Sequence, residues 1–254
     1  MRPALPLVSL VAGLLITISA ATAAMDQSKL AAAQKAAAAF VKLAGNSART
    51  GKPPREADPK VKALLDTVFD TSAIATPEFS DIPRITQWLV NADRVGVVYM
   101  LAGTGTNNLA SAANPKVGDR IGRNIAEFQI EYGRFVDFQV ALSGFTLDAV
   151  RAKMDSAPEK ERKHPKFQAG FMQVASGIAQ TFLGTLSNFS GEGITDDWRR
   201  ARLVQLNAIA PKMAETLPRE MREKLGEMTR EIGDAIPDPQ IKDSLKELAD
   251  TIAK

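Results

Sequence analysis

The sequence contains no cysteine and a single histidine among its 254 residues. Without a thiol the chain can form neither a disulfide nor a cysteine-based zinc site, and it has no thiol nucleophile. With one imidazole it cannot supply the two or more histidine ligands that many zinc enzymes use. That histidine, His164, lies between charged residues and Pro165. We therefore expect an exposed loop side chain rather than the base of a catalytic triad.

Several motifs that carry out chemistry are also missing after residue 23. The sequence has no Gly-x-Ser-x-Gly turn, no Ser-x-x-Lys pair and no calcium loop of the Asp-x-Asp-x-Asp-Gly kind. The glycine-containing segment 103–108 lacks the Gly-Lys-Ser/Thr sequence of a phosphate-binding loop, and we interpret it as a helix connection. These absences favour a protein that is not an enzyme, with no catalytic residues, no metal site and no cofactor.

The chain has little excess charge, because 32 basic residues are balanced by 29 acidic ones for a net charge of +3. Acidic and basic residues are interleaved along the sequence instead of forming one basic block. A nucleic-acid-binding surface needs such a block, so we predict no nucleic-acid partner. Hydrophobic residues make up 45% and charged residues 24%, which is the balance of an ordinary globular protein.

The N-terminus has the three parts of a secretory signal peptide. Arg2 gives a positive start, an apolar run follows, and the run ends in small residues that include Ala21 and Ala23. We predict a signal peptide over residues 1–23, with cleavage after Ala23, and a periplasmic or secreted mature chain. The alternative is an uncleaved N-terminal membrane anchor, although the run is short for a span of about 20 apolar residues.

Three further parts follow the signal peptide. Residues 24–49 are rich in alanine, the residue with the highest helix propensity, and predict an N-terminal helix. The adjacent prolines Pro53 and Pro54 interrupt this pattern, so residues 50–58 are interpreted as a Pro-rich linker. Residues 59–254 form the predicted helical body, which opens with Asp58 as an N-cap and Pro59 in the first turn.

Within the body, apolar residues recur three or four positions apart, and prolines and glycines separate the repeats. This spacing predicts an all-α protein, a bundle of about eight helices. The β-branched piece 95–99 can form a strand instead. Pro211 is expected to kink or end the helix that begins near Thr195.

The stretch 117–142 admits two interpretations. Apolar residues from Ile121 to Leu142 alternate steps of four and three, which predicts one helix. The alternation of Phe128, Ile130 and Tyr132 with polar residues suits a hairpin near 126–142, which would make the fold α+β. The helix fits better. A two-residue turn at Gly133-Arg134 would place apolar and polar residues on one face, and a three-residue turn that avoids this would centre Gly133 instead of placing it third. Ser143-Gly144 is expected to end this element, with a short helix from residue 146 to 154.

One group of charged residues in this stretch is the candidate binding site: Glu127, Glu131, Arg134 and Asp137. On one helix the two glutamates are one turn apart, where they can hold a cation or act as acid and base if another helix covers them. The opposing interpretation is an intrahelical ladder of ion pairs, in which Arg134 lies three residues from both Glu131 and Asp137.

Three functions follow from these patterns. The first is an extracytoplasmic helical binding or scaffolding protein, with a protein partner or a small apolar ligand. The second is a cell-envelope hydrolase that works through carboxylates such as Glu131. The third is a lipid-handling or membrane-surface protein, for which the phenylalanine-rich seams at 121–142 and 171–189 provide apolar surface. The absence of catalytic motifs after residue 23 favours the first function.

Overall fold

The computed structural model describes residues 25–254, and the predicted signal peptide lies outside the described residues. These residues form eleven α-helices and no β-strand; Met25 and Ile74 make an isolated bridge. The first six helices are α1 (Gln27–Ala44), α2 (Ser47–Thr50), α3 (Pro59–Val68), α4 (Ile82–Met100), α5 (Pro115–Glu127) and α6 (Gln129–Ser156). The other five are α7 (Glu159–Arg162), α8 (Pro165–Ser187), α9 (Asp196–Thr216), α10 (Arg219–Asp234) and α11 (Pro239–Ala253).

The predicted all-α class is confirmed, and the helix count is higher than the predicted eight. Two of the eleven helices, α2 and α7, are single turns of four residues. Four short 3₁₀ helices complete the connections: Thr71–Ala73, Phe79–Asp81, Leu109–Ala113 and Asn188–Ser190. The piece 95–99 lies inside α4, so the strand alternative there is wrong.

Side-chain caps explain where several helices begin. The side chains of Asp26, Asp58, Asn114, Thr195 and Asp238 each accept a hydrogen bond from a backbone N–H in the first turn. Such a cap satisfies an amide that has no partner inside the helix. Helices α3, α5, α8 and α11 also have proline in the first turn, where its missing N–H costs nothing.

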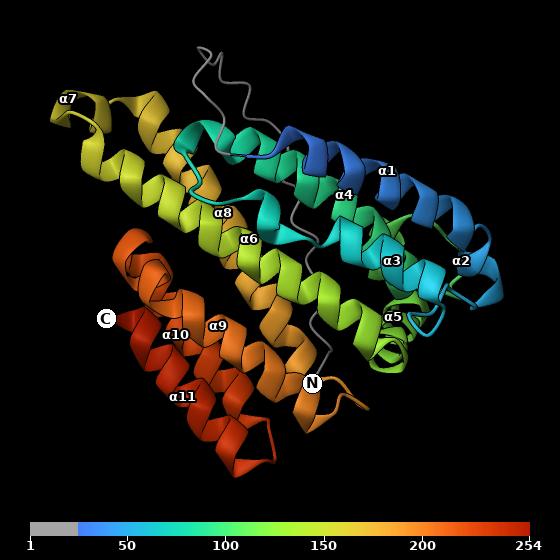
Figure 1. The fold of residues 1–254 in the computed structure, drawn as a ribbon. Coiled ribbons are helices and arrows are strands. Elements are labelled where there is room, and N and C mark those ends of the chain that lie inside the picture. The colour runs from blue at the N-terminus through green and yellow to red at the C-terminus, as the bar shows by residue number, and fades with distance from the viewer. Residues whose placement is uncertain (1–24) are drawn as a thin grey trace.

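The longest helix, α6, lies in the middle of the molecule (Figure 1). It packs on α4 on one side and on α9 on another, and it also contacts α5 and α8. Helix α4 runs antiparallel to α6, since Trp88 packs near Phe138 while Tyr99 packs near Phe128. Helix α1 packs against both α3 and α4, and α11 packs against both α9 and α10 (Figure 1).

Aromatic rings fill the space between α4 and α6. The ring centroids of Trp88 and Phe138 are 5.2 Å apart, and those of Tyr99 and Phe128 are 5.9 Å apart. The indole N–H of Trp88 donates to the carbonyl of Val68 at 2.9 Å, so the one polar atom of this buried side chain has a partner. The seam predicted from the phenylalanine spacing is therefore part of the core.

The stretch 117–142 is neither one helix nor a hairpin. It is divided at Phe128, which ends α5 with φ −107° and ψ 28°, and α6 begins at Gln129. The predicted end at Ser143-Gly144 is also wrong, since α6 runs through both residues and includes the short helix predicted after them. A Cβ at Gly144 would lie 3.1 Å from Ile209 Cγ2, so this glycine allows α9 to approach closely.

The N-terminal helix shares one core with the helical body. Ala33, Ala37 and Phe40 of α1 are buried in the same apolar cluster as α3, α4 and α6. Pro53 of the predicted linker is also buried. In α9, Pro211 lies inside the helix, which continues to Thr216.

Close packing at Gly96 generates a first prediction. A Cβ there would lie 2.6 Å from the Phe135 ring, whereas a Cβ at Gly122 would meet nothing within 4 Å. We expect Gly96→Ala to lower the free energy of unfolding by about 1–3 kcal/mol through overpacking. The same change at Gly122 should raise it by up to about 1 kcal/mol through helix propensity. Urea denaturation of both variants is the measurement, and equal effects at the two sites would contradict it.

Candidate functional site

Glu131 is the most buried charged residue of the predicted site, with 2% of its side chain exposed. Its Oε1 accepts a hydrogen bond from Arg55 Nε at 2.9 Å and another from the backbone N–H of Glu56 at 3.0 Å. The Arg55 guanidinium also lies 5.0 Å above the centre of the Phe128 ring. Because a buried carboxylate is costly without partners, these bonds fix residues 55 and 56 on α6. The predicted linker is thus docked on the helical body.

Arg134 lies one turn further along α6 and continues this network. Its Nη1 donates to Glu56 Oε1 at 2.7 Å, and its Nη2 donates to Asp66 Oδ1 in α3 at 2.6 Å. Lys62 also donates to Asp66, and the hydrogen bonds from Lys62 and Arg134 hold the pKa of the Asp66 carboxyl below its usual range. Arg134 pairs with residues far away in sequence, so the predicted intrahelical ladder is wrong here.

Asp137 faces a different neighbour. Its Oδ2 accepts a hydrogen bond from Arg202 Nη2 of α9 at 2.6 Å, and the Arg202 guanidinium lies 4.9 Å above the Trp198 ring. Burial raises the pKa of Asp137 and lowers the pKa of Arg202, while their mutual attraction opposes both shifts. Gly133 makes room for this pair, since a Cβ there would lie 2.8 Å from Arg202 Cζ. The pair fastens α9 to α6.

Glu127 completes the predicted set and lies apart from the rest of it. It is the last residue of α5, its side chain is exposed, and Oε2 is 3.8 Å from Arg120 Nη2. The break at Phe128 separates it from Glu131. The structure thus places the four predicted residues on two helices and brings together only Glu131 and Arg134, through residues 55 and 56. That any of the four binds a ligand stays a prediction.

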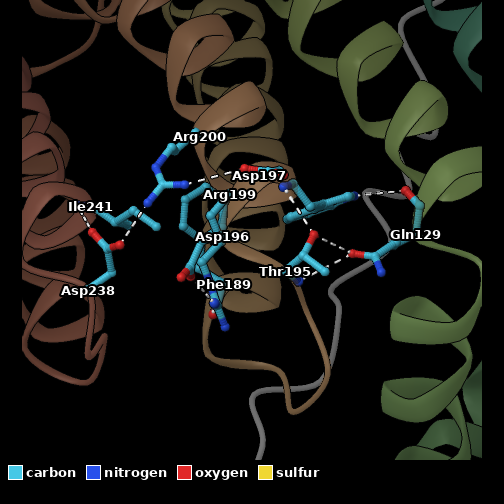
Figure 2. Close-up of polar contacts among 10 residues, drawn as sticks. Gln129, Phe189, Thr195, Asp196, Asp197, Arg199, Arg200, Asp238 and Ile241 are labelled. Carbon is cyan, nitrogen blue, oxygen red and sulfur yellow. Dashed lines mark hydrogen bonds and ion pairs between the residues drawn. The ribbon is translucent and has the colours of Figure 1, made fainter.

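A second polar junction ties α6, α9 and α11 together (Figure 2). Gln129 Oε1 accepts hydrogen bonds from the backbone N–H and the hydroxyl of Thr195, at 3.2 and 2.9 Å. Arg200 donates to Asp197 at 3.3 Å and to Asp238, the N-cap of α11, at 2.7 Å. The sequence predicts this helix start from Thr195 and its acids, but not the contacts to Gln129 or Asp238.

Asp93 is a half-buried carboxyl that the sequence analysis missed. It lies on α4, and Oδ1 accepts a hydrogen bond from Gln139 Nε2 of α6 at 3.3 Å. Burial raises the pKa of Asp93 to about 7, and burial together with the nearby Asp93 charge raises the pKa of Tyr132 to about 12. A signal was present, because Asp93 lies four residues after Leu89 and four before Val97, on a helix side that is otherwise apolar.

The single histidine is exposed, as predicted, and has a local role. His164 is the N-cap of α8, where its Nδ1 accepts a hydrogen bond from the backbone N–H of Lys166 at 3.2 Å. Across residues 25–254 no cluster of three or more His, Asp or Glu side chains is arranged to hold a metal ion. Nor does any helix in that part of the chain have the length and apolar character needed to cross a membrane.

Helix α8 presents an unusual surface. Its 23 residues include one charged side chain, Lys166. Four exposed residues spaced four apart form what we call the α8 face: Gln168, Met172, Ser176 and Gln180. The opposite side of α8 fills the core with Ile178, Phe182 and Leu186. The α8 face is therefore an exposed helix surface without charge.

Comparison with known proteins finds no matching family model, no similar curated protein and no similar solved structure. The functional argument therefore rests on the geometry of this chain alone.

The contrast between Glu131 and Glu127 generates a second prediction. Glu131→Gln removes the charge that holds Arg55, and we expect it to lower the free energy of unfolding by about 1–3 kcal/mol. Glu127→Gln removes an exposed charge at 3.8 Å from its partner and should change stability by less than about 0.5 kcal/mol. Chemical denaturation at neutral pH compares them, and an equally small loss for Glu131→Gln would show that the docking of residues 55 and 56 does not depend on it.

The raised pKa of Asp93 generates a third prediction. The folded chain holds a proton on Asp93 that the unfolded chain releases near its ordinary pKa of 3.8, so stability falls as pH rises from about 4 to about 7. The side chain of the Asp93→Asn variant does not titrate. As pH rises over that range, we expect the free energy of unfolding of the variant, minus that of the native protein, to increase by roughly 4 kcal/mol at most. Because Asp137 is present in both proteins, its contribution cancels in the difference.

Denaturant titrations at several pH values measure this difference. Asp119→Asn is the control, since Asp119 is exposed and no ion pair involves it within residues 25–254. A pH-independent difference for Asp93→Asn would mean that this carboxyl is well hydrated in the folded protein.

Proposed function

We propose that the mature chain is an extracytoplasmic helical binding or scaffolding protein that acts without chemistry and binds a protein partner through the α8 face. The observation that carries the proposal is the absence of charge from this exposed surface, whose residues are Gln168, Met172, Ser176 and Gln180. Centres of protein interfaces are depleted in charged residues and enriched in methionine. Met172, the one large apolar side chain of this face, is 44% exposed.

The rest of α8 supports this use of its surface. The core-facing residues Phe182 and Leu186 are 1% and 0% exposed, so packing holds the helix in place without help from its outer side. A partner can therefore bind a preformed surface, with little loss of conformational entropy in this chain. A small apolar ligand bound at Met172 is the other partner class that the same surface suits.

Export is part of the proposal, and the start of the described chain agrees with it. Cleavage after Ala23 would make Met25 the second residue of the mature chain. Met25 is 3% exposed and pairs with Ile74, and the backbone N–H of Asp26 donates to the carbonyl of Ala73 at 3.0 Å. The mature chain would thus enter the fold directly after the predicted cut. An uncleaved anchor at this end remains the alternative.

The carboxylate-based hydrolase has less support. Glu131 and Asp137 each accept a hydrogen bond from an arginine on another element, and these bonds fasten the predicted linker and α9 to α6. Such contacts suit structural residues better than an acid and base that must exchange protons with a substrate.

A charge placed on the α8 face tests the proposal. The native chain, Met172→Lys and Val204→Lys are expressed with their own N-termini, purified from the extracytoplasmic fraction and analysed by native mass spectrometry and pull-down. We expect a mature mass that begins at Ala24, and a partner that the native chain and Val204→Lys retain and Met172→Lys loses. Val204 is the matched control, because it is 66% exposed on α9.

Three outcomes would overturn parts of this proposal. Retention of every partner by Met172→Lys would remove the α8 face from it. A small molecule in the native mass, lost in Met172→Lys, would replace the protein partner with an apolar ligand. A mass that includes residues 1–23 would replace export and cleavage with anchoring.

A further inference from the structure

Helices α6 and α8 form a hairpin that projects beyond the rest of the molecule, with α7 at its end (Figure 1). We call residues 151–167 the arm tip; they comprise the end of α6, α7 and the start of α8. The arm tip contains six basic and three acidic residues, an excess of three positive charges.

Each acidic residue of the arm tip already has a basic partner. The pairs are Asp155 with Arg151 at 3.8 Å, Glu159 with Lys163 at 2.6 Å, and Glu161 with Lys153 at 2.8 Å. Three exposed basic residues are left without an ion pair to any residue in 25–254: Lys160, Arg162 and Lys166. Positive potential at the arm tip is therefore not cancelled locally.

Apolar side chains lie directly beside these charges. Phe167 follows Lys166 and is half-buried. One turn further, Phe171 packs with Met154 against a small cluster of Ile82, Ala149 and Val150 that is separate from the main core. Phe171 and Met154 are also half-buried, so part of their apolar surface faces solvent. The arm tip thus combines unpaired bases with partly exposed aromatic rings.

We propose that the arm tip docks on an anionic lipid surface. Lys160, Arg162 and Lys166 would contact lipid phosphates, while Phe167 reaches the boundary between headgroups and acyl chains. Basic residues next to aromatic ones are the composition of segments that lie at a membrane interface. The arm tip adjoins the α8 face at Gln168 but shares no residue with it, and the inference goes beyond the proposed function.

Geometry favours a membrane over an acidic protein as the partner. Lys160, Arg162 and Lys166 are exposed and lie within seven residues of one another at the projecting end of the hairpin. Binding to a lipid surface requires positive charge at an accessible position but no shape complementarity. Because the hairpin projects, its end can contact a flat membrane surface before the other helices do. Binding should weaken with salt, because exposed charges are screened beyond about 10 Å at 0.1 M ionic strength.

Vesicle co-sedimentation of the mature chain tests the inference. We expect binding to vesicles of phosphatidylcholine with about one third phosphatidylglycerol, and none to phosphatidylcholine alone. The triple variant Lys160→Gln, Arg162→Gln, Lys166→Gln should bind the anionic vesicles on the order of a hundredfold more weakly, since each base near the surface contributes roughly fivefold. All three residues are exposed, so we expect the helical circular dichroism signal to be unchanged.

The matched control removes three exposed bases elsewhere: Lys35→Gln, Lys42→Gln and Arg49→Gln on α1 and α2. It has the same net charge as the first variant and should keep its affinity for the vesicles. If both variants bound the anionic vesicles equally weakly, net charge alone would explain the attraction. That result would overturn the assignment of lipid binding to the arm tip. A native chain that ignores anionic vesicles would also overturn the proposal. If the arm-tip variant then lost a captured protein, the surface would belong to an acidic partner.

Discussion

A buried carboxylate on the central helix constrains the first half of this fold. Glu131 is 2% exposed, and both donors to its Oε1 come from residues 55 and 56, outside α6. Removing either donor would leave charge in the interior, where an unpartnered carboxylate is strongly unfavourable. The connection between α1 and α3 must therefore pass over α6 at this point. The hydroxyl of Tyr99 supports the same path by donating to the Pro54 carbonyl at 3.0 Å.

The pairing of charges could not be read from spacing along the sequence. Glu131, Arg134 and Asp137 lie three residues apart, which on an exposed helix predicts ion pairs within that helix. Here the three side chains pair with residues of other elements, because α6 is covered on several sides. An ion pair between two packed elements is shielded from water, and its attraction is stronger there than on an exposed helix surface. The residues on those elements lie 65 to 78 positions away. The pattern identified charged residues that matter to α6 but not their partners.

The sequence predicted which segments are helical better than it predicted the residues at which the helices end. Apolar residues three or four apart report which side of a segment faces the core, and that periodicity survives in the structure of α4, α6, α8 and α10. Glycine misled the prediction at Gly144, where it makes space for Ile209 of α9 instead of ending α6. Conversely, Phe128 has no property of a helix breaker, yet its backbone divides α5 from α6. Both outcomes depend on neighbours that only the tertiary structure supplies.

Tertiary contacts were also needed to define the surfaces of the arm, which are the arm tip and the α8 face. Lys163, Glu159 and Glu161 read as a solvated charged loop, and only their pairing shows which bases are left over. In α8 the sequence itself shows one charged residue, and burial adds which of the uncharged side chains face solvent. The end of the arm packs on a small apolar cluster of its own, so fewer buried contacts hold it than hold the rest of α6. Local stability follows such contacts, and a ligand that binds only the folded form adds its binding free energy to them. A surface that binds the arm tip would therefore stabilise the folded arm.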